Sequence, residues 1–325
     1  MSYSYKKYVT DENNLKKKLK KYGVAIIPNI LTDQECDSTI NNIWNYFELI
    51  TSSWDLPINR NNPETWRGFY ELFPKHSMLF QHWTVGHNQA SWDLRQNPKI
   101  VSVFAKLWDV SNNDLLVSFD GLSFNPPPET TNRGWYRKNT WYHSDQSFTR
   151  NNLECVQSWV TALDVEEGDA TLAFYEKSNR YHKEFSEKFK ITDKSDWYKL
   201  NKTEEDFFKQ KGCKESRIKC PKGSLVLWDS RTIHCGVEAQ KSRNKSKFRA
   251  VVYLCYQPKS FSNKKQIEKK QKAFTDLRTT SHWPAKIKLF PKYPRTYGKD
   301  LPEIKDIKPP NVTALGMSLA GFINN

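Results

Sequence analysis

The chain has 325 residues and a formal net charge of +15, and 14% of its residues are aromatic, including 12 Trp. This aromatic content can fill a core, so it argues against a disordered protein. No run of about eighteen consecutive apolar residues occurs, so the sequence predicts no membrane span. The first residues lack an apolar signal core, which predicts an intracellular, cytoplasmic protein.

The excess of basic residues raises the question of a nucleic-acid partner. Most of these residues are Lys, and the chain is also rich in Asn and Ile. An AT-rich coding sequence produces this combination without selection for binding, and a basic balance alone concerns solubility and non-specific contacts. A nucleic-acid partner is therefore the less favoured interpretation. The six Cys show no paired metal-finger spacing and are expected to be free thiols.

The N-terminal region predicts a short basic helix over residues 11–21 and a buried strand over residues 24–30. Thr32 is a plausible N-cap of the next helix, because Glu35 stands three residues later as in a capping box. This helix carries an apolar stripe at helical spacing, which predicts core rather than a cofactor site: Ile40, Ile43, Trp44 and Phe47.

Residues 115–124 predict a strand that ends before three consecutive prolines. Alternation places Ser118, Asp120 and Leu122 on one face of this strand. An unpaired buried carboxylate is costly, so Asp120 requires a partner. Both an ion pair with an arginine such as Arg137 and a contact with substrate remain open.

His143 and Asp145 are two residues apart on an extended segment, so their side chains point to the same side. They offer an imidazole nitrogen and a carboxylate oxygen to one metal ion. His234, at the end of another apolar segment, is the best candidate for the third ligand. Two His and one carboxylate on one face form the facial triad of non-heme Fe(II) oxygenases. Gln146 and Arg231 are further candidates for substrate contact.

Arg249 begins an apolar run that extends to Tyr256 and predicts a strand. An arginine at this position projects a planar, bidentate donor into an apolar interior, as a dicarboxylate co-substrate requires.

The order of His143, Asp145, His234 and Arg249 resembles the phytanoyl-CoA dioxygenase family of Fe(II)/2-oxoglutarate oxygenases. The resemblance runs from about Tyr22 to Pro258 and includes the segments at residues 22–31, 157–168 and 172–182. The sequence departs from the family pattern in two places. The loop between His234 and Arg249 is a few residues longer than usual, which keeps Arg243 as a rival to Arg249. The turn at Gly168 continues as Asp169-Ala170-Thr171.

The resemblance implies a catalytic site with Fe(II), 2-oxoglutarate and O₂. His143, Asp145 and His234 would hold the iron, and Arg249 would bind the distal carboxylate of 2-oxoglutarate. It also places Trp159 against 2-oxoglutarate, although an ordinary core tryptophan is an alternative.

The expected fold is a double-stranded β-helix, or jelly roll: an all-β core, α+β overall, with buttressing helices. Residues 1–258 would form a single oxygenase domain that begins with a strand and helix and contains a helical insertion near residues 183–216. Residues 259–325 would form a C-terminal helix and a tail, whose aromatic residues predict that it docks on the domain. His282 in this tail is expected to pack rather than to bind metal.

Three functions compete. The favoured one is hydroxylation of a small or lipid-like molecule. The second is the same chemistry on a nucleobase or protein side chain, which would require a basic groove beside the metal. The third is a non-enzymatic jelly-roll binding module, for which the loss of one of the four chemical residues would be the signature.

Overall fold

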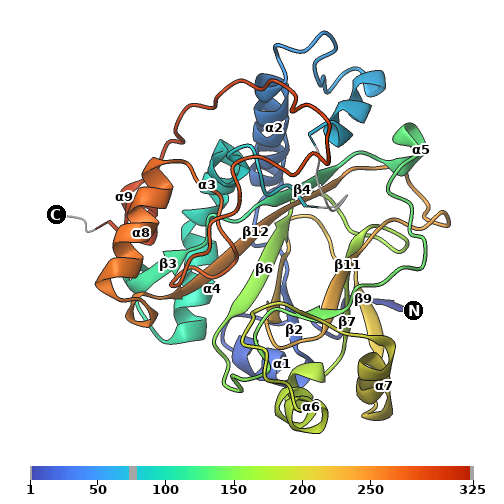
Figure 1. The fold of residues 1–325 in the computed structure, drawn as a ribbon, viewed down its shortest axis with the longest axis vertical. Coiled ribbons are helices and arrows are strands. Elements are labelled where there is room, and N and C mark those ends of the chain that lie inside the picture. The colour runs from blue at the N-terminus through green and yellow to red at the C-terminus, as the bar shows by residue number, and fades with distance from the viewer. Residues whose placement is uncertain (1, 73–78, 323–325) are drawn as a thin grey trace.

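Two packed sheets form the core of the protein in the computed structural model, which describes residues 2–72 and 79–322 (Figure 1). The strand order is β1-β9-β7-β11-β5-β8 in the first sheet and β2-β10-β6-β12-β3 in the second, where β4 also pairs with β12. The predicted jelly roll with an all-β core and flanking helices is confirmed. The strands are β1 (Ser2–Ser4), β2 (Val24–Ile27), β3 (Leu115–Val117), β4 (Leu122–Asn125), β5 (His143–Ser144), β6 (Val156–Thr161), β7 (Thr171–Tyr175), β8 (Tyr198–Lys199), β9 (Glu215–Ile218), β10 (Leu225–Asp229), β11 (His234–Val237) and β12 (Arg249–Pro258).

The central strands of the second sheet are buried on both faces. β6 lies between β10 and β12, and Trp159 pairs with Val226 on one side and with Tyr253 on the other. Side chains alternate across a pleated strand. Trp159 and Val226 therefore face the first sheet, where they pack with Leu172 and Phe174. The intervening residues of the same strands pack against helices: Val160, Leu225, Leu227, Val252 and Leu254.

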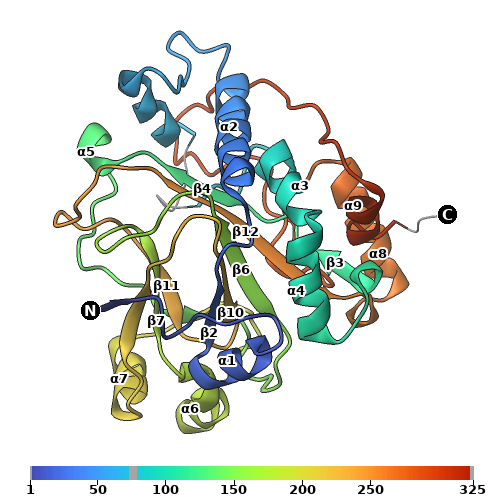
Figure 2. The same cartoon turned by 180° about the vertical axis from the view of Figure 1, so that it is seen from behind.

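Three helices cover the outer face of the second sheet, as Figure 2 shows. They are α2 (Asp33–Ile50), α3 (Gln89–Arg95) and α4 (Pro98–Trp108). The capping box at the start of α2 is confirmed, because the Thr32 hydroxyl accepts from the Glu35 N–H and the Glu35 carboxylate accepts from the Thr32 N–H. Ile43, Trp44 and Phe47 of the predicted stripe are buried in the core.

The strand predicted over residues 115–124 is interrupted between β3 and β4. Gly121 lies so close to the chain at Phe80 that an added Cβ would be 1.8 Å from the Phe80 carbonyl oxygen. The buried guanidinium of Arg95 donates from Nη2 to the Asp120 carbonyl oxygen over 2.7 Å. These contacts replace regular strand pairing and fix the position of Asp120.

The segment predicted as a helical insertion near residues 183–216 is only partly helical. It contains α6 (His182–Phe189) and α7 (Lys202–Gln210), but also β8 and the start of β9. β8 pairs with β5, where His143 lies opposite Lys199. The segment therefore supplies the neighbour of the strand that carries His143.

The C-terminal segment folds back onto the sheets and helices. It contains α8 (Lys264–Thr275) and α9 (Ala314–Leu319), joined by a long coil that passes α2 (orange to red in Figure 1). The Thr280 N–H donates to the Phe119 carbonyl oxygen over 2.9 Å, and the Lys305 N–H donates to the Ile50 carbonyl oxygen over 3.0 Å. The remaining helices are α1 (Leu15–Tyr22) and α5 (Pro128–Thr131), with 3-10 turns at Pro63–Tyr70, Val85–His87, Asn112–Asp114, Ser178–Tyr181 and Lys259–Phe261.

All six Cys are buried free thiols. Within residues 2–72 and 79–322, no helix has both the length and the apolar character needed to cross a bilayer.

Candidate metal centre and cavity

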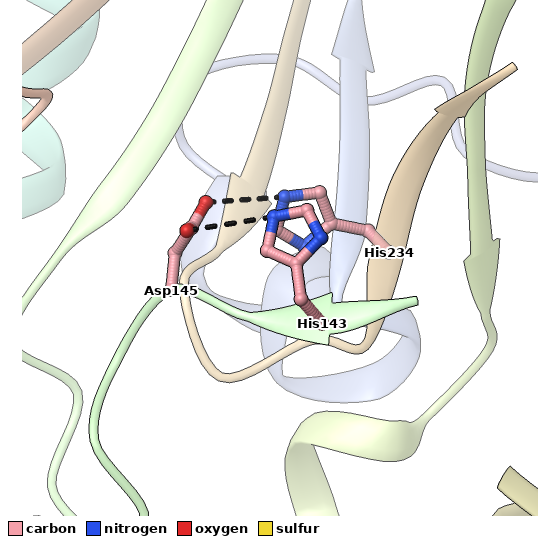
Figure 3. A group of neighbouring side chains, drawn as sticks. All are labelled: His143, Asp145 and His234. Atoms are coloured by element: carbon pink, nitrogen blue, oxygen red, sulfur yellow. Dashed lines mark ion pairs between the residues drawn. The ribbon is translucent and has the colours of Figure 1, made fainter. Parts of the chain in front are cut away.

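His143, Asp145 and His234 lie together between the two sheets (Figure 3). His143 in β5 is the cross-strand partner of His234 in β11, and their ring centroids are 4.3 Å apart. Asp145 follows β5. Its Oδ1 is 3.5 Å from His143 Nε2, and its Oδ2 is 3.3 Å from His234 Nε2. The three ligand atoms lie within 4.8 Å of one another, and no other such group of three occurs among the described residues.

Hydrogen bonds to the main chain orient both imidazoles. Nδ1 of His143 is 3.2 Å from the Trp141 carbonyl oxygen, and Nδ1 of His234 is 2.8 Å from the Thr232 carbonyl oxygen. A carbonyl oxygen only accepts, so each Nδ1 carries a hydrogen, and Nε2 is the nitrogen that faces Asp145 and can bind a metal once it is deprotonated. Outer partners of this kind are typical of metal-binding histidines.

The electrostatics of the cluster favour the protonation states that a metal requires. Burial opposes ionisation of Asp145, but the His143 and His282 imidazoles and the hydrogen bonds from His143 and His234 hold its pKa well below the usual value. Burial and the adjacent His143 lower the pKa of His234. An ionised carboxylate beside two imidazole Nε2 atoms fits Fe(II), which would take the place of the protons between them, and two His and one carboxylate on one face are a known ligand set for this metal.

The cluster opens into a cavity of about 1350 Å³, a volume that includes solvent at its mouth. Residues from both sheets and from the C-terminal segment line it. Besides the three cluster residues, the wall consists of Leu79, Gln81, Asp120, Trp141, Gln157, Trp159, Thr171, Leu172, Ser195, Asp196, Trp197, Trp228, Gly236, Arg249, Tyr253, Ser281, His282, Trp283, Lys288 and Phe290.

Arg249 and Trp159 are neighbours in this wall. Arg249 is the first residue of β12 and is 8% exposed, and its Cζ lies 5.7 Å from the centre of the Trp159 ring. Nη1 donates to the Ala170 carbonyl oxygen over 2.8 Å, whereas the buried Nε has no partner among the described residues. The side chain therefore keeps donor capacity on the cavity side of the sheet.

Arg243 does not line this cavity. Its Nε donates to Glu129 Oε1 over 2.7 Å, and its Nη1 lies 3.4 Å from Asp169 Oδ1. Gly168 packs directly on it, since an added Cβ there would lie 2.7 Å from the Arg243 Cβ. Arg243 thus joins its own loop to neighbouring segments. Of the two rival arginines, Arg249 lines the cavity and Arg243 does not.

Of the three candidate substrate contacts, only Asp120 reaches the cavity. The Gln146 amide is occupied by main-chain groups, because Nε2 donates to the Arg150 and Asn152 carbonyl oxygens and Oε1 accepts from the Glu154 N–H. Arg231 is occupied by Asp229 and by the Asn151 carbonyl oxygen. Gln146 and Arg231 therefore do not line this cavity, and their polar groups join neighbouring segments of the chain. The suggested pair of Asp120 with Arg137 does not form.

Sequence reasoning missed the contribution of the C-terminal segment to the cavity. Ser281, His282 and Trp283 line it, together with Lys288 and Phe290. His282 lines the cavity but is not part of the three-residue cluster. The aromatic tail indicated docking, but no sequence pattern indicated where it docks.

Comparisons with known proteins place this architecture in a family. The family model described as phytanoyl-CoA dioxygenase matches residues 19–244. The Ava biosynthesis cluster protein O of Aspergillus versicolor is 28% identical over 211 residues, which cover 62% of this chain and 65% of that protein. The match thus spans a little less than two thirds of that relative's length.

Two solved structures share the fold. A putative oxidoreductase from Salmonella typhimurium aligns over 97% of this chain and 86% of its own, with a TM-score of 0.62 at 13% identity. The GlcNAc Inducible Gene 2 protein of Candida albicans aligns over 82% of this chain and 68% of its own, with a TM-score of 0.57 at 12% identity. His143, Asp145 and His234 lie inside the range matched by the family model, whereas Arg249 and the C-terminal segment lie beyond it.

Proposed function

Because the chain belongs to the phytanoyl-CoA dioxygenase family, we propose that it hydroxylates a small molecule at an iron centre held by His143, Asp145 and His234. An oxygenase that uses iron and 2-oxoglutarate is the class to which this family belongs. The ligand residues, the role of Arg249 and the kind of substrate are the proposal.

The observation that carries the proposal is the convergence of the cluster and Arg249 on one cavity. Three ligand atoms lie within 4.8 Å of one another, and the arginine lines the same wall. A dicarboxylate needs both features, because one end binds the metal while the other pairs with a planar guanidinium.

When bound, the iron supplies the redox centre at which O₂ oxidises both 2-oxoglutarate and a substrate C–H bond, giving succinate, CO₂ and the hydroxylated product. The protein positions the reactants and limits water. His143 and His234 present Nε2 lone pairs, Asp145 supplies a carboxylate oxygen, and Arg249 binds the distal carboxylate. Trp159, beside Arg249, forms an apolar surface for the carbon chain of 2-oxoglutarate.

The cavity wall supports a small molecule rather than a nucleic acid as substrate. A basic groove beside the metal would favour a nucleobase, but among the described residues that line the cavity the only Lys or Arg are Arg249 and Lys288. Lys288 lies 4.0 Å from Asp196, so its charge is partly balanced. The relative from Aspergillus versicolor is named for a biosynthesis cluster, which also supports small-molecule chemistry.

Anaerobic Fe(II) binding and aerobic succinate formation test the proposal. His143→Ala, Asp145→Asn and His234→Ala should each weaken Fe(II) binding and abolish iron-dependent succinate formation while the protein stays folded. The variants should stay folded because these side chains line an open cavity rather than fill the apolar core. Asp109→Asn is the control for loss of a carboxylate, since the Asp109 side chain is 79% exposed and pairs only with Lys16 in the described structure. Wild-type activity in any two of the three cluster variants would refute the proposed ligand set.

A further inference from the structure

Asp120 places a carboxylate in the cavity wall that has no cationic partner within 4.0 Å among the described residues. Its Oδ1 accepts from the Gly121 N–H over 2.7 Å. The buried guanidinium of Arg95 lies nearby, but it donates to the carbonyl oxygens of Gly86 and Asp120 rather than to the carboxylate. The backbone is thus firmly anchored while the negative charge is left without an ion pair.

The surroundings make this charge costly in the absence of a ligand. Burial raises the pKa of Asp120 to about 6, and the Asp145 carboxylate adds to that effect. The His282 imidazole and Arg95 oppose it only in part. Buried charges in proteins are normally paired, so a cation brought by a ligand would restore the balance that the fold leaves incomplete.

Aromatic side chains also line the cavity, two of them beside the cluster. Trp141 stacks on His143 with ring centroids 4.7 Å apart, and Trp197, which is 51% exposed, lies 5.9 Å from the same imidazole. Trp283 and Phe290 of the C-terminal segment complete this part of the wall. Indole faces attract cations more strongly than any other side-chain ring, so these residues favour the same kind of ligand as Asp120.

Asp196, another carboxylate in the cavity wall, already has cationic partners. Asp196 forms a short ion pair with Arg150 and lies 4.0 Å from Lys288. Arg249 opposes Asn125 at the far end of β4, whereas Asp120 precedes the start of β4. Asn125 is five positions after Asp120 in the sequence, which corresponds to on the order of 15 Å along an extended chain. The cavity therefore has a positive end suited to a dicarboxylate and a negative end suited to a cation.

We propose that Asp120, together with the tryptophans that line the same cavity, forms a subsite for a basic nitrogen, so that the substrate is a small molecule carrying a protonated amine or a similar cationic group. Ser281, His282 and Trp283 of the C-terminal segment form part of the wall of this subsite. The inference rests on the proposed function, since it defines the substrate class of the same cavity. It also implies that an anionic substrate is disfavoured at this end, because it would face Asp120.

Binding of three matched probes tests the proposal without turnover. The probes are 2-phenylethylamine, which is cationic at neutral pH, its uncharged analogue 2-phenylethanol, and the anion 3-phenylpropionate. Calorimetric titration of the protein, anaerobic with Fe(II) and 2-oxoglutarate and separately without them, gives the three affinities. We expect the amine to bind at least about tenfold more tightly than the alcohol, which is the order expected for a desolvated cation beside indoles and a carboxylate.

Asp120→Asn should remove the preference for the amine, because the amide keeps an acceptor oxygen for Gly121 but carries no charge. Asp276→Asn is the control, since Asp276 lies on the surface after α8 and pairs with Lys272. Equal affinity for amine and alcohol in the wild type, an unchanged preference in Asp120→Asn, tighter binding of the anion, or no amine binding at millimolar concentration would each overturn the proposal. The wild-type comparison stands even if Asp120→Asn fails to fold. Failure of the proposed function is a different result: no Fe(II)-dependent binding of 2-oxoglutarate, whatever the amine does.

Discussion

Gln157 donates a hydrogen bond of 2.8 Å from Nε2 to Oδ2 of Asp145 and so joins the second sheet to the carboxylate of the first. The same oxygen faces His234 Nε2 at 3.3 Å. Gln157 lies on β6, the central strand of the second sheet, between β10 and β12. This strand therefore helps to orient Asp145, which directly follows the two-residue strand β5 of the first sheet.

We expect Gln157→Leu to weaken Fe(II) binding by roughly 10- to 100-fold, the usual effect of removing a hydrogen bond that orients a metal ligand. Fe(II) dissociation constants, measured anaerobically, test this expectation. Gln257→Leu is the matched control. Gln257 is buried on β12 and donates to the Glu154 carbonyl oxygen, but it does not line the cavity. An equal loss of affinity in both variants would mean that Gln157 acts only through overall stability.

Arg249→Ala should weaken 2-oxoglutarate binding by about 2–3 kcal/mol, or roughly 30- to 150-fold, because it removes charge-assisted hydrogen bonds to the distal carboxylate. Arg249→Lys should restore only part of this affinity, because an ammonium group cannot make two parallel contacts. Titration of 2-oxoglutarate against the Fe(II)-loaded protein measures both effects.

Arg243→Ala is the natural comparison, and it should leave the affinity for 2-oxoglutarate close to that of the wild type. Its expected effect is on stability, because the Arg243 side chain is only 4% exposed and pairs with Glu129 and Asp169. If Arg243→Ala weakened 2-oxoglutarate binding more than Arg249→Ala did, the assignment of the co-substrate end of the cavity would be wrong.

Because Lys270 is buried, we expect it to make the free energy of unfolding depend on pH in an unusual way. This residue of α8 is 1% exposed, donates to the Val117 carbonyl oxygen, and lies 4.1 Å above the Phe119 ring. Burial lowers its pKa well below 10.5. Between the folded pKa and 10.5 the unfolded chain binds more protons than the folded one, so the free energy of unfolding rises with pH in this window. Below the folded pKa, Lys270 is charged in both states, and the folded state then bears the full cost of burying that charge.

Lys270→Met should therefore lose this rise while keeping most of the packing of the side chain. Urea unfolding of the wild type and the variant at several pH values from neutral towards 10 measures the difference between their free energies of unfolding. The contributions of other titrating groups cancel in this difference. Lys265→Met, on the exposed side of the same helix, should leave the slope unchanged. A wild-type slope in the Lys270→Met variant would contradict the assigned origin of the pH dependence.

The positive net charge yields a prediction about nucleic acids. If the charge reflects base composition, binding of DNA or RNA should be weak, independent of sequence, and should fall steeply with salt as counterions are released. Adding single-stranded or duplex oligonucleotides at physiological ionic strength should not stimulate succinate formation. A several-fold stimulation that survives added salt would favour a nucleobase substrate instead.

The parts of the site that follow local rules can be predicted from the sequence. His143 and Asp145 share a side because an extended chain has a period of two, and the apolar run after Arg249 marks the start of β12. The pairing of His143 with His234 could not be derived from periodicity, because it depends on which strands become neighbours. The sequence singled out His234 only by its place at the end of another apolar segment and by the family resemblance.

Other parts depend on contacts between distant segments. Alternation placed Asp120 within one continuous strand, but the close approach of Phe80 to Gly121 and the hydrogen bond from Arg95 interrupt that strand. The tail residues around His282 reach the cavity because Thr280 bonds to Phe119, and neither residue carries a local signal of this contact. Similarly, nothing in the charged segment near residues 183–216 distinguishes β8 from the surrounding coil.

The pairing of β8 with β5 has a consequence for protein engineering. β5 has two residues and receives backbone hydrogen bonds from β11 on one edge and from β8 on the other. β8 lies in the same segment as Asp196 and Trp197, which form part of the cavity wall. Exchanging this segment for that of a relative, the obvious way to transplant substrate preference, would also remove one of the two neighbours that hold the His143 backbone. In this protein, selectivity and iron retention are therefore not separable modules, and a chimaera must be designed for both together.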